Sequence, residues 1–219
     1  MDLKSKIILI SGPTASGKSN FAIQLAKKIN GEVINADSMQ VFKELKILTA
    51  RPKRKDLKNI KHHLYGFKSV KDNYSTGNWL NDAKLRIINI KKKNKVPIFV
   101  GGTGLYFKAL VDGIVKIPDI PLIFRSRIRK RQLKIGQNKF YSELIKLDPI
   151  CKKKINKNDP QRSIRAYEVK KFTNKSLFEW YSETYSDFKK NSFVKLYIDY
   201  PRDKLLERIS LRTNEMLRD

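Results

Sequence analysis

Residue types that build disulfides and metal sites are nearly absent from this sequence. Its 219 residues include one cysteine, Cys151, and two histidines, His62 and His63. A single cysteine excludes a disulfide framework and is compatible with a reducing compartment. Because no further histidine or cysteine is available to complete a ligand set, His62 and His63 are expected to be hydrogen-bonded structural residues rather than metal ligands.

Long apolar runs are also lacking. The run nearest the N-terminus, Ile7–Ile10, is too short for a signal peptide or a membrane span. Hydrophobic residues nevertheless make up 40% of the chain, which is too many for a disordered polycation. We therefore expect a soluble, cytoplasmic protein with a folded core and no membrane partner.

Acidic residues are scarce, since 21 Asp and Glu against 48 Lys and Arg leave a formal net charge of +27. Net charge informs about partners rather than about the fold. An excess this large suits a phosphate-rich partner such as RNA, DNA or an anionic membrane surface. The alternative is a biased composition, rich in Lys, Ile and Asn, that has filled the surface with lysine.

Short apolar runs alternate with amphipathic segments along much of the chain. Strands are predicted at Lys6–Ser11, Glu32–Ala36, Val96–Val100 and Phe193–Ile198, and helices at Lys18–Asn30, Asn78–Asn94, Leu105–Val111 and Asp203–Leu217. This alternation predicts an α/β fold with a parallel sheet flanked by helices.

The strand pattern disappears in the second half of the chain, where the sequence predicts helices that break at Gly136, Pro149 and Pro160. We interpret this stretch as a mainly α-helical insertion between two strands of the sheet. The predicted organisation is an α/β core at 1–117, the helical insertion at 118–190, and a return to the core at 191–219.

A glycine-rich segment lies between the first predicted strand and the first predicted helix. Its residues fit the G-x-x-x-x-G-K-[ST] pattern of a P-loop and are Gly12, Pro13, Thr14, Ala15, Ser16, Gly17, Lys18 and Ser19. The glycines let backbone N–H groups converge, the helix start adds its dipole, and the lysine adds a full charge. This P-loop NTPase-like segment predicts binding of a nucleotide such as ATP or of another di- or triphosphate, with Ser19 holding Mg²⁺.

The residues at the ends of the other predicted strands limit the classes of reaction that the protein can catalyse. The strand at Val96–Val100 ends without the Asp that holds Mg²⁺ in most P-loop NTPases, which argues against a motor or switch protein. Two classes of enzyme remain possible: small-molecule kinases and enzymes whose leaving group is pyrophosphate. Ligands of open parallel sheets bind beyond the carboxyl ends of the strands, which brings Asp37 and Thr103 near the P-loop.

Asp37 and Thr103 each have more than one possible role. Asp37 is a candidate general base, and its alternatives are a helix N-cap or a Mg²⁺ ligand. Thr103 stands between glycines, where its hydroxyl either donates to a phosphate oxygen or stabilises the turn.

Six motifs occur in the order found in tRNA dimethylallyltransferases (tRNA isopentenyltransferases), and the sequence resembles this family from about Ile7 onward. The motifs are Gly12–Ser19, Asn35–Phe42, Thr49–Pro52, His62–Leu64, Val100–Tyr106 and Asn158–Ala166. Several ordered motifs together make the resemblance specific, although the P-loop alone is not.

The resemblance implies transfer of a dimethylallyl group from dimethylallyl diphosphate to N6 of the adenosine 3′ of the tRNA anticodon. The P-loop then holds the diphosphate of the prenyl donor, with Mg²⁺ as cofactor. The implied catalytic residues are Asp37, as the base for the adenine amine, Thr103 and Arg212, which aligns with a diphosphate-contacting arginine. The implied tRNA-binding residues are Asp37, Ser38, Met39, Gln40, Thr103, Arg125, Gln161, Arg162, Ser163, Ile164 and Arg165.

The predicted insertion has a use in this interpretation. Arg125–Lys139 carries seven basic residues and no acid, so it is a candidate clamp for the phosphates of an anticodon stem. The alternative is an ordinary solvated helix face.

The chain ends at Arg218-Asp219, within the helix that contains Arg212, whereas members of this family continue through a further helical segment. We expect either a fragment or a shortened homologue. Three hypotheses follow: a tRNA prenyltransferase that acts as a monomer, a P-loop small-molecule kinase, and an RNA- or diphosphate-binding homologue that is impaired in catalysis.

Overall fold

The computed structural model describes residues 3–52, 57 and 60–217. Arg218 and Asp219, to which the expectation about an early stop refers, lie outside the described residues. The chain divides into two compact units. The core unit comprises residues 1–112 and 186–219, and the helical unit comprises residues 113–185.

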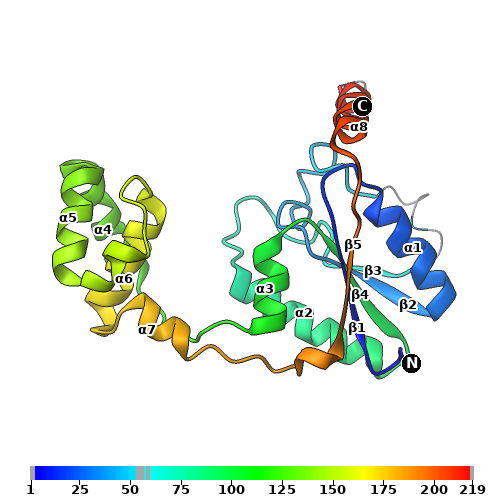
Figure 1. Ribbon diagram of the computed structural model, residues 1–219, viewed down its shortest axis with the longest axis horizontal. Coiled ribbons are helices and arrows are strands. Elements are labelled where there is room, and N and C mark those ends of the chain that lie inside the picture. The colour runs from blue at the N-terminus through cyan, green and yellow to red at the C-terminus, as the bar shows by residue number, and fades with distance from the viewer. Residues whose placement is uncertain (1–2, 53–56, 58–59, 218–219) are drawn as a thin grey trace. The chain divides into compact units, whose positions relative to one another are not determined.

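The core unit is built on one five-stranded parallel sheet (Figure 1). Its strands are β1 (Ile7–Ser11), β2 (Gly31–Asn35), β3 (His62–His63), β4 (Val96–Gly101) and β5 (Phe193–Tyr197). They lie in the order β3-β2-β4-β1-β5. Ser11 pairs with Gly101, and Asn35 pairs with Val100, so β1, β2 and β4 end together at one edge of the sheet.

Helices cover both faces of this sheet. In Figure 1, α1 (Lys18–Ile29) lies on one side, and α2 (Thr76–Lys91) and α3 (Gly104–Asp112) lie on the other. The core unit also contains the short 3-10 helix η3 (Lys190–Ser192) and ends with α8 (Arg202–Met216).

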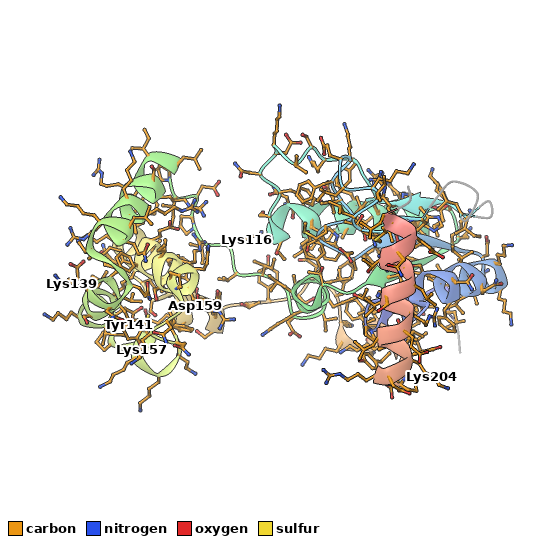
Figure 2. All side chains as sticks on the ribbon, turned by 90° about the horizontal axis from the view of Figure 1, so that it is seen from above. Lys116, Lys139, Tyr141, Lys157, Asp159 and Lys204 are labelled. Carbon is orange, nitrogen blue, oxygen red and sulfur yellow. The ribbon has the colours of Figure 1, made fainter. Side chains whose placement is uncertain are left out.

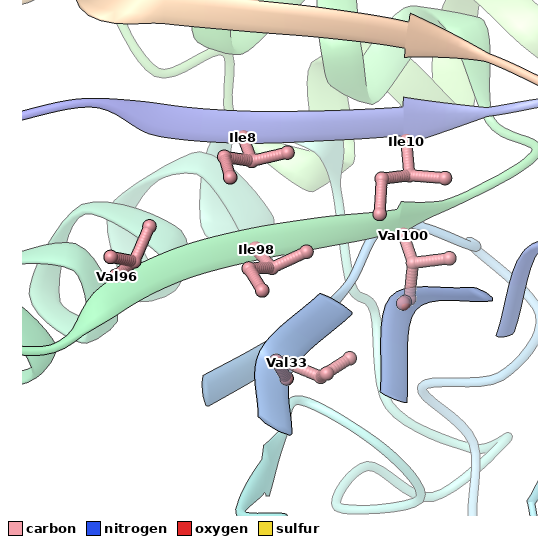
Figure 3. Packing of buried hydrophobic residues seen from close by; sticks show 8 residues of the cluster. Ile8, Ile10, Val33, Val96, Ile98 and Val100 are labelled. Atoms are coloured by element: carbon pink, nitrogen blue, oxygen red, sulfur yellow. The ribbon is translucent and has the colours of Figure 1, made fainter. Parts of the chain in front are cut away.

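Alternate strand residues form the two halves of the core, as the period of a strand requires. Figure 3 shows the cluster on the α1 side, where Ile8 and Ile10 of β1 pack with Ile98 and Val100 of β4. On the α2 side, Trp79 is fully buried. Its ring stacks on Tyr106, with centroids 4.1 Å apart, and its indole N–H donates to the Asn35 carbonyl at 3.0 Å.

The helical unit contains no strand among its described residues. Its elements are α4 (Leu122–Ile135), α5 (Gln137–Leu147), η2 (Pro149–Lys153), α6 (Pro160–Thr173) and α7 (Leu177–Ser182). Gly136, with φ = 78°, separates α4 from α5, and Pro149 and Pro160 begin η2 and α6, so the predicted breaks are confirmed. Cys151 is buried in the core of the helical unit. Burial and the neighbouring Asp148 raise the pKa of its thiol to about 12.

The predicted fold class, a P-loop NTPase-like parallel sheet flanked by helices with a helical insertion, is confirmed. Four of the strands were predicted, while β3 was not, because its two residues form a strand only by pairing with β2. In the part of the chain that the structure describes, no helix combines the length and apolarity that crossing a lipid bilayer requires.

Candidate active site

The P-loop connects β1 to α1 and is packed so closely at Gly12 that a side chain is excluded there. A Cβ on Gly12 would lie 2.8 Å from the Ile198 carbonyl oxygen, closer than real Cβ contacts. Gly17 caps α1 with φ = 84°, a left-handed conformation that glycine adopts without strain. The Ser16 hydroxyl is buried and has no hydrogen-bond partner among the described residues. An unpaired buried hydroxyl in a loop of converging amides is suited to an anionic ligand.

Lys18 folds back over this loop. Its Nζ donates to the Pro13 carbonyl at 2.9 Å. Burial lowers the pKa of Lys18, the Asp37 carboxylate partly offsets that effect, and the positive charge of Arg212 lowers the pKa further. These influences mean that the P-loop lysine shares one electrostatic site with Asp37 and Arg212.

Asp37 follows the C-terminal end of β2 and is oriented by the backbone around it. Its N–H donates to Asn35 Oδ1 and its carbonyl accepts from Asn35 Nδ2, both at 2.9 Å. One carboxylate oxygen, Oδ1, accepts from the Met39 N–H at 2.9 Å. Bends and turns rather than a helix follow Asp37, so the helix-N-cap hypothesis is wrong.

The Asp37 charge acts on four ionisable neighbours. It raises the pKa of Arg212, although burial lowers that pKa more strongly. Burial raises the pKa of Tyr106 to about 12, with a further contribution from Asp37, and the same two causes raise the pKa of Tyr65. Both tyrosines therefore keep their phenolic protons at neutral pH, and Asp37 has hydroxyl groups and cations around it.

Thr103 connects the end of β4 to the end of β2. Its N–H donates to the Ala36 carbonyl at 3.1 Å, and its hydroxyl oxygen accepts from the Ser38 N–H at 2.9 Å. Gly101 permits this close approach, because a Cβ there would lie 2.1 Å from the Ala36 carbonyl oxygen. Thr103 thus stabilises the turn, which is one of the two roles predicted for its hydroxyl.

The motif at Thr49–Pro52 joins Gln40 to α8. The Thr49 carbonyl accepts from Gln40 Nε2 at 3.1 Å and from Arg212 Nη2 at 3.2 Å. Arg51 donates to the Phe42 carbonyl at 3.2 Å and braces the same loop. The predicted residues Asp37, Gln40 and Arg212 therefore belong to one connected site in the core unit.

Arg208 is a residue near this site that sequence reasoning missed. A Cβ on Gly17 would lie 3.8 Å from Arg208 Nη2, so the guanidinium lies beside the P-loop. Its Cζ lies 4.9 Å from the centre of the Tyr200 ring, a cation–π arrangement that restrains the side chain. The signal in the sequence is its spacing, because Arg208 is four residues before Arg212 and shares its helix face.

The remaining predicted tRNA-binding residues lie in the helical unit. Gln161, Arg162, Ser163, Ile164 and Arg165 form the first turns of α6, where Gln161 and Arg162 are exposed. Ser163 is fully buried, and its hydroxyl donates to the Asp159 carbonyl at 2.7 Å and accepts from Gln137 Nε2 at 3.1 Å.

The basic segment Arg125–Lys139 forms most of α4 and the start of α5. Two of its arginines, Arg125 and Arg129, pair with Glu168, and Arg131 pairs with Glu143. The side chains of Lys139 and Lys157 extend from the surface of the helical unit (Figure 2). The segment is thus an exposed basic surface that is partly ordered by ion pairs.

Among the described residues no group of three or more His, Cys, Asp or Glu side chains is arranged to hold a metal ion. Both histidines have hydrogen bonds within the protein, as expected. His62 Nδ1 lies 2.7 Å from the Ile60 carbonyl oxygen, and His63 Nε2 lies 2.7 Å from Glu32 Oε2.

The P-loop between a buried strand and a helix, on a parallel sheet, defines the core unit as a P-loop NTPase-like domain. Residues 40–219 match the IPP transferase family. The chain is 61% identical over 217 residues to the tRNA dimethylallyltransferase of Pelagibacter ubique and 47% identical over 173 residues to that of Rhizobium etli. The chain belongs to the tRNA dimethylallyltransferase (IPP transferase) family, a family of transferases, as its motifs predicted.

Solved structures agree with this assignment. A crystal structure of a eukaryotic dimethylallyltransferase acting on tRNA superposes with a TM-score of 0.85 at 30% identity over 97% of this chain. The full-length tRNA isopentenylpyrophosphate transferase of Bacillus halodurans superposes with a TM-score of 0.61 at 31% identity over 98% of this chain.

The relatives are longer than this chain. The match to the Pelagibacter protein covers 99% of this chain and 69% of that protein. The match to the Rhizobium etli protein covers 79% of this chain and 58% of that protein. The chain spans 53% of the eukaryotic enzyme and 66% of the Bacillus halodurans enzyme.

Proposed function

We propose that this protein transfers a dimethylallyl group from dimethylallyl diphosphate to N6 of the adenosine that follows the anticodon of a tRNA. One observation supports the proposal beyond family membership: burial lowers the pKa of both the P-loop Lys18 and Arg212 of α8, and the Asp37 carboxylate partly offsets this effect at both cations, so the three charges share one site. A carboxylate among cations suits this reaction, because one site must accept a proton and stabilise a departing diphosphate.

In the proposed reaction, N6 of the adenine forms a bond to C1 of the dimethylallyl group as the bond from C1 to the diphosphate oxygen breaks. The electron pair of that bond leaves with pyrophosphate, and the N6 proton passes to the Asp37 carboxylate. An adenine amine is a weak nucleophile, so a positioned base lowers the barrier. The adenosine has to leave its stack to reach the base, which is easiest in a single-stranded loop.

The negative charge that accumulates on the leaving pyrophosphate needs several partners. We assign the P-loop amides of Gly12–Ser19, the ammonium of Lys18 and the guanidinium of Arg212 to this role, because preorganised donors stabilise developing charge most effectively. The unpaired Ser16 hydroxyl fits the same ligand.

Mg²⁺, when bound, would add positive charge at the diphosphate. The Ser19 hydroxyl would hold it together with the phosphate oxygens of the donor, which are the hard ligands that Mg²⁺ prefers. Such a site, which relies mostly on substrate oxygens, agrees with the scarcity of clustered carboxylates among the described residues.

Transfer of label tests the proposal directly. The full chain, Mg²⁺, dimethylallyl diphosphate labelled in its prenyl group and bulk tRNA are incubated together. Label that enters tRNA and is recovered on adenosine N6 supports the proposal. Phosphate transfer from ATP to a small acceptor would instead identify a kinase. Donor or tRNA binding without transfer would identify a homologue that is impaired in catalysis.

A further inference from the structure

The helical unit contains a carboxylate that is buried against three arginines. Glu168 on α6 is 1% exposed. Arg125 Nε donates to its Oε2 at 3.3 Å, Arg165 Nη1 lies 3.7 Å from the same oxygen, and Arg129 Nε lies 3.8 Å from Oε1. This Oε1 accepts no hydrogen bond from any described residue.

The arginines around Glu168 come from two helices. Arg125 and Arg129 are four residues apart and so share one face of α4, while Arg165 precedes Glu168 by three residues on α6. Burying a lone carboxylate is costly, and its pairing with guanidinium groups is what compensates that cost. Glu168 therefore gives the three guanidinium groups a common anionic partner that restrains them.

The three guanidinium groups keep most of their donors for another ligand. Arg125 and Arg129 approach Glu168 through Nε, and Arg165 approaches it through one Nη, whereas each guanidinium has five N–H donors. Their side chains are 35%, 58% and 39% exposed. One carboxylate against three cations leaves the cluster positively charged and open to solvent.

We propose that Glu168 is a positioning residue for RNA: it holds Arg125, Arg129 and Arg165 as a preformed site for adjacent phosphates of the tRNA backbone. Guanidinium groups bind phosphate oxygens bidentately, and groups that are already ordered lose less entropy when they bind. This inference rests on the proposed function, because it takes tRNA as the ligand.

Replacing Glu168 by glutamine separates positioning from simple charge. E168Q raises the net charge of the protein by one, so Coulomb attraction alone predicts tighter RNA binding. Loss of positioning predicts the opposite, a rise in Kd of about tenfold, which corresponds to one charge-assisted hydrogen bond. The slope of log K against log salt should also become shallower by about one.

E143Q is the matched control for E168Q. Glu143 pairs with Arg131 through bonds of 2.8 and 3.0 Å, but it is 35% exposed and lies on α5. Binding of an anticodon stem-loop RNA to the full chain is measured for wild type and both variants, with thermal unfolding alongside. Weaker binding in E168Q but not in E143Q supports the proposal. Binding in E168Q that is unchanged, tighter, or weakened equally with E143Q overturns it.

A second pair of variants keeps the proposal testable if E168Q fails to fold. R129K keeps the positive charge on an exposed side chain but removes the Nε that faces Glu168. R86K is its control, because Arg86 is an exposed arginine of α2 in the core unit and lies outside the predicted RNA-binding segments. The expected result is a several-fold rise in Kd for R129K and no rise for R86K. Equal affinities overturn the proposal.

The wild-type protein distinguishes this inference from the proposed function. If the wild type labels tRNA while E168Q and R129K bind RNA normally, only the positioning role of Glu168 fails. If the wild type does not bind tRNA at all, the proposed function and the Glu168 site both fail.

Discussion

The two units hold the side chains of their candidate sites by different means. In the core unit the backbone does so: Gly12 packs against a carbonyl, and Asn35 clamps Asp37 through main-chain groups. In the helical unit an ion pair does so, because Arg125 and Arg129 meet the buried Glu168. The shape of the core site therefore depends on close packing of the backbone, and the arrangement of the helical surface depends on ion pairs.

This difference predicts opposite sensitivities. Removing a charge should leave the shape of the core site intact, whereas adding a single methyl group should damage it. The helical unit should tolerate small steric changes on its exposed surface but respond to the loss of a buried charge.

The largest effect is expected from D37N, which removes a charge from the core site without changing its shape. Asn keeps an oxygen that accepts from the Met39 N–H, so the loop should stay in place. Loss of the proposed general base should reduce the transfer rate by about 10²- to 10⁴-fold. Single-turnover transfer measures the rate, and tRNA and donor affinities measured in parallel should stay close to wild type. A variant with full transfer activity would remove Asp37 from the role of base.

Two adjacent glycines test the dependence on space. A Cβ on Gly101 would meet the Ala36 carbonyl at 2.1 Å, while a Cβ on Gly102 would have no atom within 4 Å. G101A should lower the free energy of unfolding of the core unit by about 1–3 kcal/mol or more, as overpacking does. G102A should leave the free energy of unfolding nearly unchanged. Urea denaturation measures both, and equal stabilities would contradict the packing argument.

Charge removal beside the P-loop should affect donor binding more than stability. Arg208 and Lys204, which Figure 2 labels, are both exposed residues of α8, but it is Arg208 whose Nη2 lies near Gly17. R208A should weaken binding of dimethylallyl diphosphate by about tenfold, the effect of one charge-assisted hydrogen bond. K204A, which loses the same charge, should bind the donor almost as wild type does. Calorimetric titration with the donor measures the difference, and equal losses in both variants would show that only net charge matters.

The smallest expected effect is a loss of stability at low pH. It comes from a buried carboxylate of the core unit that is paired with basic side chains, as Glu168 is in the helical unit. Glu32 is 1% exposed and pairs with His63 at 2.7 Å and with Lys95 at 3.0 Å. Burial opposes ionisation of Glu32, but the hydrogen bonds outweigh it and lower its pKa below 4.5. Burial also lowers the pKa of His63 below 6.5, although Glu32 opposes this.

Both shifts act in the same direction. Each folded-state pKa lies below its unfolded value, so the unfolded chain binds more protons and acid favours unfolding. The contribution of this pair to the free energy of unfolding should be fully present above pH 6.5. It should fall below pH 6.5 as His63 becomes protonated, and fall again below pH 4.5 as Glu32 becomes protonated. Urea midpoints measured across this range test the prediction, and E32Q should lose the lower step. A wild-type midpoint that does not change with pH would exclude this linkage.

Local sequence predicted much of the core unit. The strand at Ile7–Ser11, the P-loop and the helix from Lys18 follow from neighbouring residues alone, because apolar period and glycine placement act over a few positions. The ends of β2 and β4 lie at one sheet edge by the rules of parallel sheets, which is why the segments that carry Asp37 and Thr103 were expected at that edge. The Ser38 N–H, next to Asp37, donates to the Thr103 hydroxyl there.

Other features were beyond that reach. β3 is too short to carry a periodic pattern, and it exists because β2 offers an edge to pair with. Arg208 was one of many basic residues until α8 brought it beside Gly17. Glu168 resembled any surface acid in a charged helix, since its burial comes from the packing of α4 against α6.

The sequence by itself determined most elements of the core unit, the P-loop and the family, because each is encoded by residues that are close together in the chain or in a fixed order along it. Only the tertiary structure decided which charges share a site and which carboxylates are buried. The physical reason is that burial and electrostatic coupling depend on distances between segments far apart in sequence, which no local pattern specifies.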